Sequence, residues 1–159
     1  MDILFHTDKY TFSYRVAGIC IQNGKVLLQK PSNDSAFALP GGHVAFGETN
    51  AQALIREFRE EMSVDISVGD LKWVGEVFFS WDNKPCHQIC LYYAVDIQSD
   101  NIPMDSMFIG KEQMEGRKFC IEFHWVPLTE LKNIDVYPTN AAELLCQTDD
   151  SVQHFIYRE

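Results

Sequence analysis

The sequence predicts a domain of mixed α and β structure in which helices cover a mixed β-sheet. Three observations lead to this prediction: several segments rich in β-type residues, an Asn-Gly pair between two of them, and one segment with strong helical periodicity. Strands and helices combined in this way occur in α/β and α+β domains, and the residues alone leave both classes open. The length of 159 residues suits one domain with a substantial core, so we expect a single domain over residues 1–159.

A β-hairpin is predicted near the N-terminus. Residues 12–22 and 25–30 carry mostly β-type apolar side chains, and Asn23-Gly24 separates the two runs. Both central residues of a type I′ turn have positive φ, which Asn and Gly adopt most easily. The following segment, 31–38, is predicted as a loop that leads into a Pro-Gly-Gly turn.

A helix is predicted over residues 49–62. Thr49 or Asn50 can cap its first turn. Because each residue of an α-helix advances by roughly 100°, apolar side chains gather on one arc that faces the core. This arc consists of Ala51, Leu54, Ile55, Phe58 and Met62.

Three carboxylates share another side of the same helix. With Glu57 taken as zero, Glu61 lies near ~+40° and Glu60 near ~−60°. Like charges at positions i and i+4 destabilise a helix, so the cluster indicates a bound cation, and Mg²⁺ takes oxygen ligands of this kind. A solvated, salt-bridged helix surface is the competing interpretation. The preceding Gly41 and Gly42 favour the ion site, because their backbone amides can approach an anion closely.

The second half of the chain is predicted to contain more strands and a short helix. From 98 to 118 the apolar periodicity disappears, and we expect a long loop there, of a length that is often functional. The other expected elements are strands at 71–81, 87–97 and 119–126, a turn at 82–85 and a short helix at 139–147.

Composition limits the classes of partner and compartment. The net charge of −10 argues against a nucleic-acid backbone as the main partner, since such binding depends on Lys and Arg. A small phosphorylated substrate remains compatible with this charge if a metal neutralises the site. No signal peptide and no apolar run of about 18 residues is present, so we expect a cytoplasmic protein that does not span a membrane. We expect buried, reduced thiols at Cys20, Cys86, Cys90, Cys120 and Cys146.

The segment 42–64 carries a family resemblance. It contains Gly42, five residues, Glu48, seven residues, and then Arg56-Glu57-Phe58-Arg59-Glu60-Glu61-Met62-Ser63-Val64. This spacing resembles the Nudix box, G-x5-E-x7-R-E-U-x-E-E-x-G-U, in which U is a bulky apolar residue. Segments 39–42 and 125–131 resemble common Nudix flanks, so the resemblance extends to most of the chain.

The resemblance implies both a fold and a reaction. The fold would be an α/β/α sandwich with a mixed β-sheet and the Nudix loop-helix-loop. The activity would be that of a pyrophosphohydrolase that needs Mg²⁺ or Mn²⁺ and cleaves a nucleoside diphosphate linked to another moiety. The partner would therefore be a small phosphorylated substrate, a nucleotide derivative. Dimers are common with this resemblance, so a homodimer stays open, although no residue pattern here points to one.

Site residues follow from the resemblance by motif position. Arg56 would orient Glu57 through an ion pair, and Glu48 would support the loop and the metal shell. The catalytic group would consist of Arg56, Glu57 and Glu60. Gly42 and His43 would contact the substrate phosphates or support the loop. The expected metal ligands are Glu57, Glu60, Glu61 and the backbone carbonyl oxygen of Gly41.

The general base is left open by the sequence. By resemblance Glu57 activates water in some members of the family, whereas others use a carboxylate from a variable loop. The alternatives in this chain are Glu112 and Glu115 in the predicted 98–118 loop and Glu122 in the next strand. Each of these three also has a simpler interpretation as a solvated surface residue.

Aromatic residues of the 71–81 strand form a second candidate group. Phe78, Phe79 and Trp81 can stack on a base, or they can be core residues, and adjacent positions on a strand cannot share a face.

One departure from the motif keeps alternative functions open. Ser63 replaces the second glycine of the box, and a non-glycine residue in a left-handed C-cap costs on the order of 1 kcal/mol. Such a cost would lower the stability of the helix end, but it would not remove a metal ligand. Two alternatives to the hydrolase remain: a catalytically inactive nucleotide-sensing module and an RNA-end or RNA-cap processing enzyme. The sequence does not separate nucleoside triphosphates, ADP-ribose and dinucleoside polyphosphates as substrates.

Overall fold

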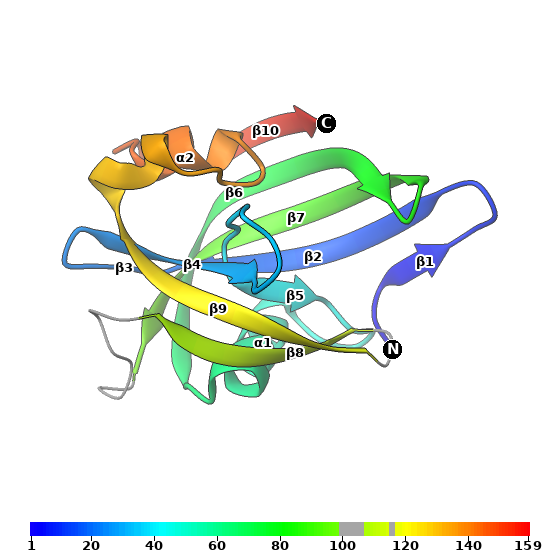
Figure 1. Cartoon of the computed structure of the whole chain (residues 1–159), viewed down its shortest axis with the longest axis horizontal. Coiled ribbons are helices and arrows are strands. Elements are labelled where there is room, and N and C mark those ends of the chain that lie inside the picture. Colours follow the sequence, from blue (N-terminus) through cyan, green and yellow to red (C-terminus); the bar gives the residue numbers. More distant parts are fainter. Residues whose placement is uncertain (99–106, 115–116) are drawn as a thin grey trace.

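The structure is a computed structural model, and it describes residues 1–98, 107–114 and 117–159 (Figure 1). The N-terminal half contains β1 (Leu4–His6), β2 (Thr11–Ile19), β3 (Ile21–Gln22), β4 (Lys25–Pro31), β5 (Gly41–His43) and α1 (Asn50–Met62). The C-terminal half contains β6 (Ile66–Trp81), β7 (Lys84–Ile97), β8 (Phe108–Met114), β9 (Arg117–Pro127), the 3-10 helix η1 (Leu128–Asn133), α2 (Asn140–Leu145) and β10 (Gln153–Arg158).

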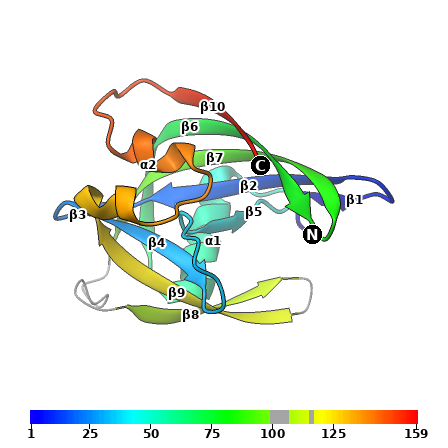
Figure 2. The ribbon, with the colours of Figure 1, turned by 45° about the horizontal axis from the view of Figure 1, so that its top comes forward.

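The strands of the described residues form two sheets. A six-stranded sheet has the order β1-β2-β7-β6-β10, with β5 paired to β2, and a four-stranded sheet has the order β3-β4-β9-β8. The pairs β2–β7 and β6–β10 are parallel and the other pairs are antiparallel, so the larger sheet is mixed. Figure 2 shows the smaller sheet below the larger one.

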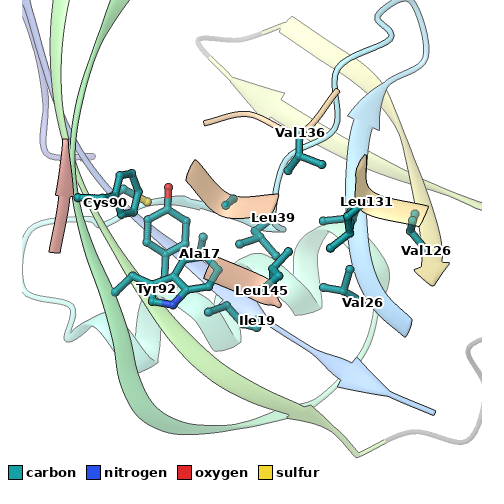
Figure 3. Close-up of a cluster of buried hydrophobic side chains, with 14 of the residues drawn as sticks. Ala17, Ile19, Val26, Leu39, Cys90, Tyr92, Val126, Leu131, Val136 and Leu145 are labelled. Carbon is teal, nitrogen blue, oxygen red and sulfur yellow. The ribbon is translucent and has the colours of Figure 1, made fainter. Parts of the chain in front are cut away.

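The two helices cover opposite faces of the larger sheet. Val16 belongs to the buried cluster that contains Phe58 of α1, whereas its neighbour Ala17 belongs to the cluster that contains Leu145 of α2. Successive side chains of a strand point to opposite faces, so α1 and α2 lie on different sides of β2. Figure 3 shows the second cluster, in which Ala17, Tyr92 and Leu145 lie together. The predicted α/β/α arrangement is confirmed.

Both predicted turns between strands are confirmed. Asn23 and Gly24 have φ values of 51° and 72°, and Asp82 and Asn83 have φ values of 48° and 61°. Positive φ at both central residues is the signature of the type I′ hairpin turn. The strand predicted at 12–22 is interrupted before Ile21, which divides it into β2 and β3. The strands predicted at 71–81 and 87–97 begin earlier, as β6 and β7.

The long loop predicted over residues 98–118 is wrong in part. Residues 108–114 form β8, which pairs along its whole length with β9. Phe108 stacks on Phe123 of β9, with ring centroids 5.1 Å apart. A Cβ at Gly110 would overlap the α1 backbone at Glu61, so close packing against the helix favours a residue without a side chain. Such a glycine contributes nothing to an apolar periodicity, which explains why the strand was missed.

Three short strands were also missed. The Pro-Gly-Gly segment was predicted as a turn, yet residues 41–43 form β5, which pairs with β2. The edge strands β1 and β10 were not predicted because three and six residues give little periodicity. β10 is a strand because it pairs in parallel with β6, and the sequence of β10 itself does not reveal that partner.

The helix predicted at 49–62 is confirmed, with a cap at each end. The Thr49 side chain accepts a hydrogen bond from the Gln52 backbone N–H, and the Gln52 side chain accepts one from the Thr49 N–H. This reciprocal pair is a capping box. At the other end Ser63 adopts the left-handed conformation, with φ 58° and ψ 36°, and its N–H donates to the Arg59 carbonyl at 3.0 Å. Serine therefore keeps the cap geometry that the box glycine would provide.

Ser63→Gly is expected to raise the free energy of unfolding by about 0.5–1 kcal/mol, because glycine adopts positive φ without steric cost. Urea unfolding at neutral pH measures the change. Ser67→Gly is the matched control, since Ser67 is exposed in the extended strand β6 and glycine there lowers stability by about 0.5–1 kcal/mol. A loss of stability in Ser63→Gly would contradict the cap assignment.

The cysteine prediction is confirmed for three residues and wrong for two. Cys20, Cys86 and Cys90 are buried free thiols. Cys120 and Cys146 are also free but exposed. Cys120 alternates with the buried Ile121 on β9, so it faces outward. Within the described ranges, no helix is both long and apolar enough to cross a membrane.

Candidate active site

Arg56 of α1 joins the loop before the helix to the carboxylates on the helix. Its Nε and Nη2 donate to the two carboxylate oxygens of Glu48 at 2.7 and 2.9 Å. Its Nη1 donates to Glu57 at 2.6 Å and to Glu60 at 3.4 Å. Its Nη2 also donates to the His43 carbonyl at 3.0 Å. A guanidinium suits this role because its planar fork of donors binds a carboxylate through two parallel hydrogen bonds.

Glu48 fastens the loop to α1. One of its carboxylate oxygens also accepts from the Ala45 N–H at 3.0 Å. The hydrogen bonds from Arg56 are the main cause that lowers the pKa of Glu48 from 4.5 to about 2, and the Ala45 N–H adds to the shift. The side chain is 22% exposed and stays ionised at neutral pH. The predicted role of Glu48 in supporting the loop and the metal shell stays a prediction, and these hydrogen bonds are the contacts through which it would act.

Glu48→Gln is expected to lower the free energy of unfolding at pH 7 by about 2 kcal/mol, since it removes a charge-assisted pair that is partly buried. The folded pKa lies below the ordinary value. The contribution of Glu48 is therefore fully present above about pH 4.5 and is lost as the pH falls towards 2. Urea unfolding of both proteins between pH 7 and 2.5 measures the difference, which should shrink over the acidic range.

Glu130→Gln provides the control for this titration. Glu130 is exposed and accepts a hydrogen bond from Asn133 within η1, so its loss should change stability by less than about 0.5 kcal/mol. A difference between wild type and Glu48→Gln that stays constant down to pH 2.5 would contradict the assigned pKa.

The glycine before the loop makes room for Glu57. A Cβ at Gly42 would overlap the Glu57 carboxylate. The Glu57 side chain is 13% exposed, and burial raises its pKa above the ordinary value, although the Arg56 guanidinium opposes the shift. Ionised Glu57 is therefore stabilised by any additional positive charge that lies next to it.

The donor set around Glu57 consists of hard oxygen atoms. Glu61 is 5% exposed and Glu60 is 62% exposed at its side chain, and both lie on the Glu57 side of α1. The Gly41 carbonyl accepts a hydrogen bond from Arg15 Nη2 at 2.7 Å and has a second lone pair. Among the residues that the structure describes, no group of three or more acidic, histidine or cysteine side chains is placed so that it could hold a metal ion, so the side chains of Glu57, Glu60 and Glu61 do not converge on one point. Carboxylates supplemented by a carbonyl and water suit Mg²⁺, which rarely takes a full protein cage.

A cavity of about 350 Å³ lies next to this loop. Two of its lining residues connect it to the loop: His43 of β5 adjoins Gly42, and Arg15 of β2 donates to the Gly41 carbonyl. Polar and aromatic side chains from both sheets line the cavity, among them Arg15, Gln29, His43, Phe79, Trp81 and Gln88.

His43 forms part of the cavity wall. Its ring stacks on Trp81, with centroids 5.8 Å apart and an interplanar angle of 28°, and its Nε2 lies 3.1 Å from Ser13 Oγ. Burial, followed by the charge of Arg15, lowers the pKa of His43 from 6.5 to about 4, so the ring is neutral at pH 7. These contacts favour the structural interpretation of His43 over direct binding of phosphate.

The aromatic residues of β6 divide between the two faces of the sheet. Phe79 and Trp81 line the cavity, and their rings stack 6.3 Å apart at 22°. Phe78 points to the other face, where the Arg158 guanidinium lies 4.1 Å from its ring centroid. At the cavity beside the Nudix box, stacking on a ligand is therefore available to Phe79 and Trp81, whereas Phe78 does not line this cavity.

Comparison with known proteins decides the family. The family model described as the NUDIX domain matches residues 13–147, which include the whole 42–64 segment. The chain belongs to the NUDIX family. The predicted resemblance is confirmed, and the loop and helix centred on Arg56 are its Nudix box.

Two curated proteins are similar in sequence to part of this Nudix chain. The ADP-ribose pyrophosphatase of Methanocaldococcus jannaschii is 36% identical over 86 residues, which cover 52% of this chain and 49% of that protein. The CTP pyrophosphohydrolase of Escherichia coli is 41% identical over 59 residues, which cover 35% of this chain and 44% of that protein. The chain spans about half the length of the curated relatives that it matches.

Solved structures share the Nudix fold. A UDP-X diphosphatase superposes with a TM-score of 0.61 at 14% identity, covering 94% of this chain and 68% of that one. The MutT protein of Bacillus halodurans superposes with a TM-score of 0.59 at 16% identity, covering 92% and 90%. At this identity the likeness establishes the fold.

The alternative bases outside the Nudix box differ in their surroundings. Glu122 forms an ion pair with Lys30 at 2.7 Å and lies 3.4 Å from His124 Nε2. The hydrogen bond from Lys30 is the main cause that lowers the pKa of Glu122. Glu112 lies in β8, but its side chain is outside the described residues, as is the whole of Glu115. These three residues stay predictions, as does the assignment of Glu57 as the base.

Three cavity residues were missed by sequence reasoning. Arg15, Gln29 and Gln88 belong to β2, β4 and β7, and they meet only when these strands assemble. Gln29 and Gln88 are 6% and 7% exposed. A signal was present in the sequence, because each is a polar residue within a strand of largely apolar or aromatic residues. Buried polar side chains in such strands need hydrogen-bond partners, and this requirement marks them as candidates.

Proposed function

We propose that the chain is a divalent-metal-dependent pyrophosphohydrolase that cleaves a pyrophosphate linkage in a nucleoside diphosphate-type substrate through attack of water at phosphorus. The observation that supports this most strongly is the packing of the Glu57 carboxylate into the space left by Gly42, beside Arg56. This packing places a carboxylate with a raised pKa next to backbone atoms of the Gly41-Gly42 segment. Two relatives that bear the names ADP-ribose pyrophosphatase and CTP pyrophosphohydrolase agree with the reaction class.

The Nudix box supplies the residues for the metal. We propose that Glu57, Glu60, Glu61 and the carbonyl oxygen of Gly41 hold Mg²⁺ or Mn²⁺ together with water. The bound ion would polarise phosphoryl oxygens, neutralise charge on the leaving group and lower the pKa of water.

The chain's own groups prepare the water and the substrate. Glu57 is proposed as the general base, because its carboxylate is the group that Gly42 and Arg56 hold in a defined position within the Nudix box. Arg56 fixes the direction of that carboxylate through the 2.6 Å hydrogen bond. Glu48 keeps Arg56 in place through two hydrogen bonds, and it acts as a positioning residue.

Two observations argue against the alternative functions, a nucleotide-sensing module and an RNA-processing enzyme. The sensing module was suggested in part by Ser63, but Ser63 adopts the left-handed cap that the motif requires. A net charge of −10 does not favour binding of an RNA backbone. The metal-dependent hydrolase is the function that accounts for the whole Glu48, Arg56 and Glu57 arrangement.

A substrate panel with product identification tests the proposal. The panel contains nucleoside triphosphates, ADP-ribose and dinucleoside polyphosphates, each with Mg²⁺, with Mn²⁺ and with a chelator. We expect release of a nucleoside monophosphate from at least one class, and no release with the chelator. In Glu60→Gln and Glu61→Gln we expect turnover to fall at least about 100-fold.

Glu76→Gln is the control for the glutamate variants. Glu76 is partly exposed on β6 and is bound to His154 at 2.8 Å, away from the Nudix box, so its replacement should leave turnover unchanged. The absence of turnover on every member of the panel would overturn the proposal. Turnover that survives both Glu60→Gln and Glu61→Gln undiminished would overturn it equally.

A further inference from the structure

The cavity beside the Nudix box is lined by three aromatic rings that lie nearly parallel to one another. His43, Trp81 and Phe79 form a row of aromatic rings whose successive planes are inclined by only 28° and 22°. All three line the cavity. Aromatic side chains arranged in this way bind the face of a heterocyclic base without regard to its identity.

A chain of hydrogen bonds fixes the orientation of one carboxamide at this cavity. Ser13 Oγ has a single proton and donates it to Gln88 Oε1 at 3.3 Å. His43 Nε2, which lies 3.1 Å from the same hydroxyl, must therefore be the donor in that contact. The oxygen of Gln88 is engaged by Ser13, so the groups that its carboxamide can offer to a ligand are the two N–H donors.

Gln29, on β4 of the four-stranded sheet, contributes a hydrogen-bond acceptor that complements the donors of Gln88. Its backbone exchanges two hydrogen bonds of 2.8 Å with Ala38, which fixes the main chain. Its side chain lines the cavity, and its Oε1 is buried with no hydrogen-bond partner within the part of the chain that the structure describes. A buried acceptor without a partner is unfavourable, so a ligand donor, reached by rotation of the carboxamide, would stabilise it.

We propose that Gln29 and Gln88 are specificity-determining residues that recognise the hydrogen-bonding edge of a nucleobase stacked on Trp81. This inference rests on the proposed function, because it names the part of the substrate that the cavity would hold. Gln88 offers donors and Gln29 offers an acceptor, so the ring must present at least one acceptor and one donor, as nucleobases do. The cavity of about 350 Å³ is at the small end of ligand sites and suits one base-sized group.

The chemistry predicts strong discrimination against ligands without a base. A site with buried hydrogen-bonding groups rejects an analogue that leaves those groups unpaired. Ribose 5-phosphate carries the sugar and the phosphate but no ring to stack on Trp81 or to bind the two carboxamides. It should therefore bind much more weakly than a nucleotide.

Equilibrium binding in the presence of a chelator tests the inference without turnover. Isothermal titration measures adenosine, cytidine, guanosine and uridine 5′-monophosphates and ribose 5-phosphate with the full chain. We expect at least one nucleotide to bind at least about 10-fold more tightly than ribose 5-phosphate. Gln29→Met and Gln88→Met should each weaken that nucleotide about 10-fold and leave ribose 5-phosphate unchanged.

Gln98→Met is the matched control, since Gln98 is an exposed carboxamide that follows the end of β7, donates to Ser67 at 3.1 Å and is not among the residues that line the cavity. It should leave all affinities unchanged. Equal affinity of wild type for ribose 5-phosphate and for every nucleotide would overturn the inference, and this result needs no variant to fold. Unchanged nucleotide affinity in folded Gln29→Met and Gln88→Met would overturn it as well.

The same titrations separate this inference from the proposed function. Suppose that binding depends on the base and on both carboxamides, but no panel member is cleaved. This result would support the inference and overturn the proposed hydrolase activity. Cleavage of diphosphates with no preference for a base would support the hydrolase and overturn the inference.

Discussion

Glu57→Gln is expected to lower turnover by about 10³-fold while the protein remains folded. The substitution keeps the shape of the side chain but removes the proton acceptor and one negative ligand, and loss of a positioned base alone is worth 10²–10⁴-fold. Burial raises the pKa of Glu57, so its charge is unfavourable in the metal-free protein. Loss of that charge offsets loss of the Arg56 ion pair, and we expect the free energy of unfolding without metal to stay equal or to rise.

Steady-state kinetics and urea unfolding on the same samples measure both effects. Glu76→Gln is again the control, since it removes a carboxylate of similar size outside the Nudix box. Opposite changes in activity and stability are the mark of a functional group that is held at a cost to stability. Full activity in Glu57→Gln would exclude Glu57 as the base and return the role to Glu112, Glu115 or Glu122.

Gly42→Ala is expected to reduce turnover by about 10²-fold, with a much smaller effect on stability. The added Cβ would overlap the Glu57 carboxylate, which is the movable end of a flexible side chain. The carboxylate can therefore swing aside, and the backbone of β5 does not have to shift. A displacement of about 1 Å at a reacting group is enough to cost 10²-fold in rate. The measurements are turnover and the midpoint of urea unfolding.

Gly69→Ala is the control for a glycine substitution in a strand. A Cβ at Gly69 would make only ordinary contacts with Ala94, and the residue is exposed on β6. Both activity and stability should change little. If Gly42→Ala retained full activity, the close fit between Gly42 and Glu57 would not matter for the reaction.

Local signals explain which parts of the fold could be predicted. The helix at 49–62 has an apolar arc and a capping box within its own sequence, and both hairpin turns contain residues that favour positive φ. The strands β5, β8 and β10 lack such signals. They form because β2, β9 and β6 supply hydrogen-bonding partners, and these partners are distant in sequence.

The same distinction applies to the candidate site. Arg56, Glu57 and Glu60 lie on one helix, so helical periodicity brings them together without knowledge of the fold. The cavity is different, because Ser13 and Gln88 meet only through the parallel pairing of β2 with β7. The sequence therefore predicted the reaction class from one contiguous motif, whereas the residues that face the proposed base required the assembled sheets.

The most direct test of the central claim is the initial rate of pyrophosphate-bond cleavage as a function of free Mn²⁺, in wild type and in Glu61→Gln. If α1 and the Gly41 carbonyl form the metal site, the rate should be zero with chelator and should saturate with Mn²⁺ in wild type. Glu61→Gln should need at least about 10-fold more Mn²⁺ to reach half of its maximal rate. Cleavage that persists without metal, or identical metal dependence in the two proteins, would contradict the claim.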